Sequence, residues 1–200
     1  MERINRDETI LLNIVKMLTA RGLLLEKDME SNYKNLIKQK SEEMTYKIKS
    51  YNNITYNIMF VYGKLSTIKK ISGLDLFINE SKGQNRIFIV DNVNQKAYKQ
   101  FLEYRNTEVF FDYELLINLI EHELQPKFEV LNEQQKKEFY EMYDIEKKDM
   151  AKMETIDPVA RYFNLSQGDI IKCIRPSISA GNGFFYRYVK EVPISNFFET

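Results

Sequence analysis

Few side chains in this 200-residue sequence have the chemistry of a catalytic site, and the single histidine is the first to consider. His122 is flanked by Glu121 and Glu123, an arrangement in which a carboxylate could support an imidazole acting as a general base. A lone histidine on an apolar segment is more often a structural residue held by hydrogen bonds. We therefore favour a structural role for His122 and keep the general base as the alternative.

The single cysteine, Cys173, lies among Ile170, Ile171 and Ile174. This context predicts a small buried hydrophobic residue rather than a nucleophile. One cysteine excludes an internal disulfide and, with one histidine, leaves almost no zinc ligands. We therefore expect neither a metal site nor a cofactor.

Two further patterns could carry metal or phosphate chemistry. Asp75 and Glu80 would suit a metal-dependent nuclease, but the acid-x-lysine cluster that such an enzyme needs on a central strand is not evident. Gly181 and Gly183 form a lone glycine pair with no helix expected after it, unlike a phosphate-binding loop. We predict no catalytic residue and keep the nuclease as an alternative.

The charge balance limits the kind of partner. Basic and acidic side chains both number 29, so the net charge is zero, whereas a dedicated nucleic-acid binder usually has a basic excess. Residues 1–115 carry 18 basic and 15 acidic side chains, and eight lysines fall between residues 31 and 70 against two acids. This stretch predicts local contact with nucleic acid; a solvated lysine-rich surface explains it equally well.

The chain has no sequence feature of membrane targeting. Met1 is followed by Glu2 and Arg3 rather than by an apolar signal core, and no run of about 18 apolar residues occurs. We expect a soluble, intracellular protein without membrane contact.

The first half of the chain alternates between helical and strand-like patterns. Apolar spacing predicts a helix that begins with a capping box of Asn5 and Glu8 and ends at Gly22. The other elements expected here are a helix at 30–39, a strand at 54–62 closed by Gly63, a helix at 64–70, a buried strand at 86–90 and a helix at 96–105. This order predicts an α/β domain over roughly the first 110 residues.

The second half has a different character. Residues 113–124 are apolar on one side and fit either a strand or a helix. Asn132, with Gln135 at the capping-box position, opens a helix that runs to Tyr143. Its inward-facing residues are expected to be Phe139, Met142 and Tyr143.

Further along, Asp157 and Pro158 are typical of a helix start, since proline at the first helical position has no N–H that needs a partner. That short helix ends near Phe163. Strands are expected at 169–175 and 184–189, separated by a glycine-containing loop at 177–183.

From Tyr113 onward, the order and spacing of these blocks resemble the shared fifth subunit of eukaryotic RNA polymerases and its short archaeal counterpart. The matching segments are residues 114–118, 122–127, 133–143, 157–163, 168–175, 177–181 and 186–189. In the first half, Met17–Leu23 and Arg86–Asp91 resemble the eukaryote-specific part of the same family more weakly.

The chain departs from the family pattern at several places. Phe128 stands where the family has a second histidine, and Met150-Ala151 replaces a Leu-Pro pair. A proline-containing loop of the family is replaced by the shorter Asn92–Gln95, and the chain continues past Val189 to Thr200. These differences indicate a divergent lineage, for which we favour a large DNA virus.

The resemblance implies an α/β (α+β) fold with a restriction-endonuclease-like jaw domain over residues 1–115. A small mixed α/β assembly domain is then expected over residues 116–200. It also implies a non-catalytic polymerase subunit that docks on the largest subunit and forms part of the lower jaw near downstream double-stranded DNA. The location would be the nucleus for a cellular protein, or the virion and host cytoplasm for a viral one.

The matched residues also suggest where partners bind. Arginine and tyrosine are favoured anchors in protein interfaces. The expected subunit-interface residues are His122, Pro126, Arg161, Arg175, Tyr186 and Arg187. The expected DNA-proximal residues are Asn92, Asn94, Lys96 and Lys99. Lys96, Lys99 and the lysines within residues 34–49 would contact phosphates without reading bases. A free-standing regulator that reuses the module remains an alternative to the polymerase subunit.

Overall fold

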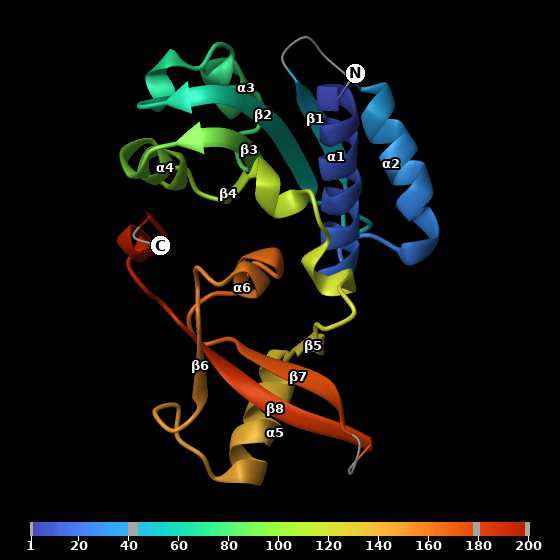
Figure 1. The fold of residues 1–200 in the computed structure, drawn as a ribbon, viewed down its shortest axis with the longest axis vertical. Helices are drawn as coiled ribbons and strands as arrows, with labels where there is room; N and C mark the ends of the chain where they lie inside the picture. Colours follow the sequence, from blue (N-terminus) through green and yellow to red (C-terminus); the bar gives the residue numbers. More distant parts are fainter. Residues whose placement is uncertain (1, 40–43, 178–180, 199–200) are drawn as a thin grey trace. The chain divides into compact units, whose positions relative to one another are not determined.

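The computed structural model describes residues 2–39, 44–177 and 181–198 (Figure 1). The chain divides into two compact units, Met1–Ile117 and Asn118–Thr200. The boundary expected from the sequence, between residues 115 and 116, lies two residues before this division. Lys40, Glu42 and Glu43 of the lysine-rich stretch, and residues 178–180 of the expected loop, lie outside the described residues.

The first unit is built on a four-stranded sheet with the order β1-β2-β3-β4. Its strands are β1 (Thr45–Lys49), β2 (Thr55–Leu65), β3 (Asn85–Val93) and β4 (Thr107–Phe111). β1 runs antiparallel to β2, whereas β2, β3 and β4 are mutually parallel. The helices of this unit are α1 (Glu2–Ala20), α2 (Met29–Lys38), α3 (Leu74–Glu80) and α4 (Gln95–Leu102).

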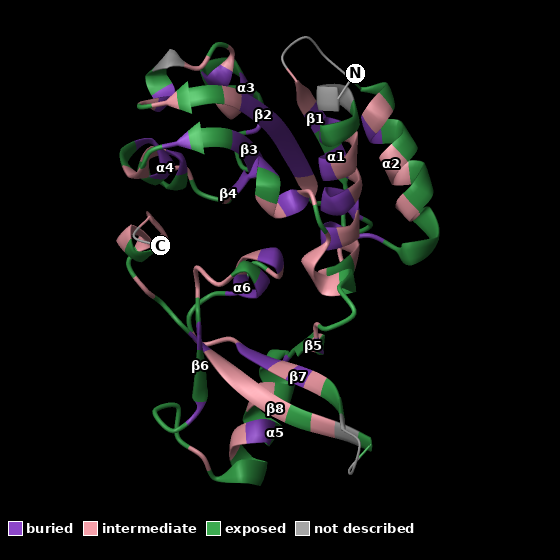
Figure 2. Cartoon of the chain, viewed as in Figure 1, coloured by how far each residue is buried: buried purple, intermediate pink, exposed green. Residues whose placement is uncertain are grey.

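Strand β3 lies at the centre of this core. Ile87, Phe88, Ile89 and Val90 are all completely buried, so both faces of the strand are covered (Figure 2). Such a continuous apolar run is expected of a parallel strand between two helical layers.

Helices cover the two faces of this sheet. On one face, the ring of Phe88 packs against Phe77 of α3 at 5.4 Å and against Phe101 of α4 at 4.7 Å between ring centroids. On the other face lies α1, which Tyr62 of β2 joins by a hydrogen bond to Asp7. The α/β fold class expected from the sequence is confirmed.

Several local expectations for the first unit were wrong. The first helix begins at Glu2, and the Asn5 carbonyl already accepts a hydrogen bond from the Thr9 hydroxyl, so Asn5 is an interior residue and not a cap. Gly63 does not close the second strand. It has a φ of +94° at an irregularity after which β2 continues to pair with β3 as far as Leu65.

The helix expected at 64–70 is therefore only a 3₁₀ turn at Ile68–Lys70. Pairing with a distant strand decided this stretch, and its local spacing contains no signal of that pairing. The helix expected at 30–39 is confirmed as α2. The strands β1 and β4 and the helix α3 were not expected from the sequence.

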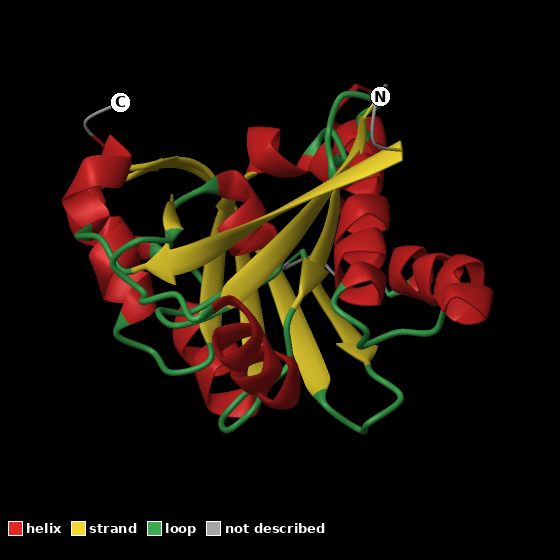
Figure 3. Cartoon of the chain, turned by 90° about the horizontal axis from the view of Figure 1, so that it is seen from below, coloured by secondary structure: helices red, strands yellow, loops and turns green. Residues whose placement is uncertain are grey.

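The second unit contains another four-stranded sheet, with the order β5-β7-β8-β6. Its strands are β5 (Lys127–Val130), β6 (Ala151–Glu154), β7 (Ile170–Ser177) and β8 (Gly181–Lys190). β7 pairs antiparallel with both β5 and β8, whereas β6 runs parallel to β8. The helices are α5 (Glu133–Tyr143) and α6 (Pro158–Tyr162), and Figure 3 distinguishes helices from strands.

The two faces of this second sheet carry separate apolar clusters. The cluster with α6 includes Val159, Cys173 and Val189, whereas the cluster with α5 includes Phe139 and Ile170. Because residues 173 and 170 of β7 differ by an odd number, the alternation of a strand sends them to opposite faces.

The helix starts of the second unit were predicted correctly. Asn132 and Gln135 form the expected capping box of α5, and the Asp157 carboxylate accepts a hydrogen bond from the Val159 N–H at 2.8 Å. Strands at 169–175 and 184–189 are confirmed as parts of β7 and β8.

Other expectations for this part of the chain were wrong. Met142 and Tyr143 do not face inward, because their exposed fractions are 74% and 52%. Residues 113–124 form neither one strand nor one helix but contain 3₁₀ turns at Asp112–Leu115 and Leu119–Glu121. The strands β5 and β6 were not expected. No helix among the described residues is long and apolar enough to cross a membrane.

Candidate functional site

The alternation of side chains along β7 and β8 sorts the expected interface residues between the two faces of the second sheet. Ile171 pairs with Arg187, and Cys173 pairs with Phe185, in the antiparallel register. Arg175, two residues beyond Cys173, therefore lies on the same face as Phe185 and Arg187. Tyr186 lies on the opposite face.

The face with Arg175 and Arg187 contains a pocket of about 250 Å³, which we call the arginine pocket. It brings together Pro126, Arg175 and Arg187, three of the residues expected at a subunit interface. Its lining is completed by Leu119, Gln125, Phe128, Met153, Asp157, Pro158, Val159, Cys173 and Phe185. All of these residues belong to the second unit.

Both guanidinium groups pack on one aromatic ring. The Cζ atoms of Arg175 and Arg187 lie 5.2 Å and 5.7 Å from the centroid of the Phe185 ring, within the range of a cation–π contact. Neither guanidinium forms an ion pair with any residue that the structure describes. Two cationic groups thus share one face, and no described carboxylate forms an ion pair with either of them.

The interior of the pocket is chemically inert. Cys173 is 1% exposed, which confirms the expected buried cysteine. Burial raises the pKa of its thiol above the ordinary value, although the positive charges of Arg187 and Arg175 act in the opposite direction. A thiol that keeps its proton is a poor nucleophile, so the pocket suits binding better than covalent chemistry.

Helix α6 forms the apolar wall of the pocket. Asp157 caps this helix, which places Pro158 and Val159 at its first turn against the sheet. Phe128 packs edge-on against Phe163 at 6.3 Å between ring centroids. Its ring makes the wall more apolar than an imidazole at this position would.

Three expected interface residues, His122, Arg161 and Tyr186, do not line the arginine pocket. His122 is exposed, and its Nδ1 accepts a hydrogen bond from the Leu124 N–H at 3.2 Å, in agreement with the favoured structural role. The guanidinium of Arg161 packs over the ring of Phe197 at 4.7 Å, so the segment that follows Val189 covers part of this side chain.

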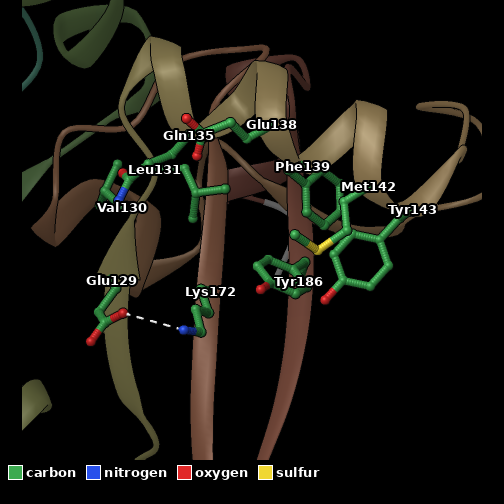
Figure 4. Close-up of a pocket in the computed structure, with 10 residues that line it drawn as sticks. All are labelled: Glu129, Val130, Leu131, Gln135, Glu138, Phe139, Met142, Tyr143, Lys172 and Tyr186. Atoms are coloured by element: carbon green, nitrogen blue, oxygen red, sulfur yellow. Dashed lines mark ion pairs between the residues drawn. The ribbon is translucent and has the colours of Figure 1, made fainter.

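Tyr186 contributes to a second pocket, of about 190 Å³, on the opposite face of the sheet (Figure 4). Its ring packs against Phe139 at 4.6 Å and against Tyr143 at 5.7 Å between centroids. Burial raises the pKa of the Tyr186 phenol, and the neighbouring Tyr143 raises it further. At the other end of the pocket, Lys172 lies 3.7 Å from Glu129, so this lysine has a carboxylate partner.

The four residues expected near DNA are exposed and lie together in sequence around the start of α4. The expected loop at Asn92–Gln95 was wrong, because Asn92 belongs to β3 and Gln95 begins α4. Asn94 alone connects the two elements, and its side chain caps α4 by accepting from the Ala97 N–H at 2.9 Å. Lys96 and Lys99 then stand one turn apart on the helix.

The acids considered for nuclease chemistry are not clustered. Asp75 and Glu80 are exposed residues of α3, in agreement with scattered surface carboxylates. Within residues 2–39, 44–177 and 181–198, no three histidine, cysteine, aspartate or glutamate side chains are placed to hold a metal ion.

Sequence reasoning missed Phe185 as the ring on which both arginines pack. The alternating pattern of β8 could have revealed it, because Phe185 and Arg187 are two residues apart in a predicted strand. No sequence pattern indicated that Pro126 and Val159 would line the same pocket, because their positions depend on pairing between distant segments.

The chain is similar to known subunits of DNA-directed RNA polymerases. The family model described as the C-terminal domain of the RNA polymerase subunit Rpb5 matches residues 117–189. DNA-directed RNA polymerase subunit 5 of Acanthamoeba polyphaga mimivirus is 28% identical over 193 residues, which cover 92% of each chain. The subunit rpabc1 of DNA-directed RNA polymerases I, II, and III from Dictyostelium discoideum is 28% identical over 94% of this chain and 98% of its own length. The corresponding subunit RPABC1 of Caenorhabditis briggsae is 31% identical over 70% of each chain.

Proposed function

Because the chain belongs to the family of the fifth subunit of DNA-directed RNA polymerases, we propose that it is a non-catalytic subunit that docks on the largest subunit of its polymerase through the arginine pocket. The active site of such an enzyme would then lie in other subunits. The observation that carries the docking proposal is the pair of guanidinium groups, Arg175 and Arg187, which have no ion-pair partner among the described residues.

Physical arguments support a docked second unit. A unit of about 80 residues buries a limited core, and binding to the folded state stabilises such a unit by mass action. The second unit also leaves large apolar side chains at its surface, including Leu124 at 85% exposed and Phe184 at 56% exposed. A larger partner would remove such surface from water.

An affinity purification tests the subunit assignment directly. The tagged chain should recover two very large polymerase subunits in stoichiometric amounts from its native cell or infected host. Recovery of the chain alone, or with small partners only, would exclude the polymerase subunit and favour a free-standing regulator.

The same purification addresses location. We propose a polymerase encoded by a large DNA virus, which would place the chain in the virion and the host cytoplasm; the similarity to the mimivirus subunit over 92% of each chain supports this. Recovery of cellular large subunits would instead assign the chain to the nuclear polymerase.

For the first unit we propose a place in the lower jaw, with Lys96 and Lys99 contacting phosphates of downstream DNA. Both lysines are exposed and adjacent on α4, and such contacts would be non-specific and sensitive to salt. Their number is small and the net charge of the chain is zero, so the isolated chain should bind DNA weakly.

The jaw proposal can be tested on the purified polymerase. Replacing both lysines by glutamate (Lys96→Glu with Lys99→Glu) should weaken DNA binding and reduce the slope of log affinity against log salt by about two. The matched control, Lys27→Glu with Lys82→Glu, changes the charge of the same unit equally at other exposed positions. Equal slopes for the two double variants would exclude phosphate contact by α4.

A further inference from the structure

The two faces of the second sheet treat their cationic side chains differently. On the face of α5, Lys172 lies 3.7 Å from Glu129, and Lys136 lies 2.7 Å from both Asp169 and Glu133. On the face of α6, no described residue forms an ion pair with Arg175 or Arg187. Lys172 and Lys136 are therefore paired with carboxylates of the chain, whereas Arg175 and Arg187 have no ion pair with a described residue.

One carboxylate, Asp157, lines the same pocket, so its charged lining residues sum to +1. The Oδ1 of Asp157 accepts the hydrogen bond from the Val159 N–H that caps α6. Its negative charge sits at a helix N-terminus, where the helix dipole favours it. The two arginines remain available to a group from outside the chain.

Packing on the Phe185 ring lowers the entropy that the two guanidinium groups lose when they bind a partner. A guanidinium that lies on an aromatic ring is held in orientation, so less side-chain entropy is lost when its N–H groups form hydrogen bonds. Planar N–H donors of this kind match the two oxygens of a carboxylate. Phe185 thus supports both donors at 5.2 Å and 5.7 Å.

The rest of the pocket is mainly apolar. Pro126, Phe128 and Val159 contribute its walls, and Leu119 packs partly buried beside them. Its volume of about 250 Å³ is below the range of roughly 300–1,000 Å³ in which proteins take drug-sized ligands. The fitting occupant is one acidic side chain with an adjacent apolar residue.

We propose that the arginine pocket binds an aspartate or glutamate side chain, flanked by an apolar residue, that the largest polymerase subunit presents. This proposal rests on the proposed function and names the chemistry by which docking occurs. The carboxylate bridges Arg175 and Arg187, and the apolar neighbour packs on Pro126 and Val159.

The first test removes the charge of the pocket and keeps side chains of similar polarity. The double variant Arg175→Gln with Arg187→Gln should recover at least tenfold less of the large subunits in the affinity purification. The control variant, Lys172→Gln with Lys152→Gln, removes two charges from the opposite face and should recover them as the wild type does. Equal recovery by both double variants would overturn the proposal.

The second test identifies the occupant without removing either arginine. A photo-crosslinking amino acid in place of Gln125, which lines the pocket, should capture in the assembled polymerase a peptide of the largest subunit that contains an aspartate or glutamate. A captured peptide without an acidic residue, or from a different subunit, would overturn the proposal.

The purification distinguishes a chain that does not dock from a chain that docks without an acidic side chain in the pocket. If the wild-type chain recovers no large subunit, the proposed function itself is wrong. If the wild type recovers them and the arginine variant does so equally, docking stands and the acidic occupant is excluded. Unfolding curves of the purified variants show whether a loss of recovery reflects a loss of fold.

Discussion

Three arginines of this chain have different roles because their surroundings differ. Arg21 forms a two-pronged ion pair with Glu108, at 2.9 Å and 2.7 Å, in which the side chains are 5% and 15% exposed. Arg86 is also buried but donates to the Ser81 hydroxyl and to backbone carbonyls, and burial lowers its pKa. Arg175 is exposed and has neither arrangement. Exposed donors can exchange water for a binding partner, whereas buried donors that are paired within the chain hold the fold.

The pair of Arg21 and Glu108 predicts a strong effect of one substitution. Glu108→Gln leaves the Arg21 guanidinium buried without a countercharge, so the free energy of unfolding should fall by about 3 kcal/mol. Urea denaturation measures this fall. The double variant Arg21→Met with Glu108→Leu removes both charges and should cost less than the single variant.

A surface pair provides the control for that experiment. Lys34 and Glu30 are 64% and 80% exposed, so replacing Lys34 by glutamine should leave the urea midpoint unchanged. If Glu108→Gln were equally silent, the buried pair would not contribute to stability.

Buried phenols and the buried thiol predict how stability depends on pH. Burial raises the pKa of Tyr46 and Tyr56 above 10.0 and that of Cys173 above 9.0. The unfolded chain therefore loses these protons at lower pH than the folded chain does. The free energy of unfolding is highest below the ordinary thiol value and should fall as pH rises through the ordinary values toward the raised ones.

Urea midpoints between about pH 8 and about pH 11 measure this fall. Cys173→Ala should remove the earliest part of it and leave the part due to the tyrosines. A midpoint that stays constant over this range would contradict the assignment of raised pKa values.

At the scale of elements, helix α5 shows how local capping and tertiary packing combine. Asn132 and Gln135 satisfy each other's backbone N–H groups at 2.9 Å, which fixes where the helix starts. Phe139 then packs among Tyr140, Tyr143 and Tyr186, which fixes the face of the helix that meets the sheet.

The cap of α5 predicts that two substitutions of Asn132 lower the free energy of unfolding by different amounts. Asn132→Ala leaves the Gln135 N–H without its side-chain acceptor and should lower the free energy of unfolding of the second unit by about 1 kcal/mol. Asn132→Ser keeps an acceptor oxygen and should be nearly neutral. Equal losses for both variants, measured by urea denaturation, would show that the side chain acts through packing and not as a cap.

At the scale of the whole molecule, the chain consists of two units with separate sheets and separate cores. Phe101 belongs to the core of the first unit, and Phe139 belongs to a core cluster of the second. Two cores of this kind can respond independently to a local loss of packing.

A reciprocal pair of substitutions tests that independence. Phe139→Ala should destabilise the second unit by about 3–5 kcal/mol, and Phe101→Ala should do the same to the first. Hydrogen exchange of backbone amides should show faster exchange in the substituted unit only. If either substitution speeds exchange in both units, the chain unfolds as one cooperative body.

The features that the sequence determined by itself are those with a local physical cause. The caps at Asn132 and Asp157 were predictable because each carboxylate or amide bonds a backbone N–H only two or three residues away. The buried run of β3 was predictable because a strand covered on both faces must be apolar throughout. The resemblance to a polymerase subunit rested on the same kind of local blocks, and the relatives confirm it.

The tertiary structure decided whatever depends on contacts between distant segments. The short strands β1, β4, β5 and β6 exist because partners elsewhere in the chain satisfy their hydrogen bonds, and sequences of four or five residues contain no sign of those partners. For the same reason only the fold brings Pro126 beside Arg175 and Arg187 and separates Tyr186 from them. Residue types and their alternation can be read from the chain itself. Whether a carboxylate pairs with Arg175 or Arg187 depends on where the fold places every segment that could supply one, and no described segment does so.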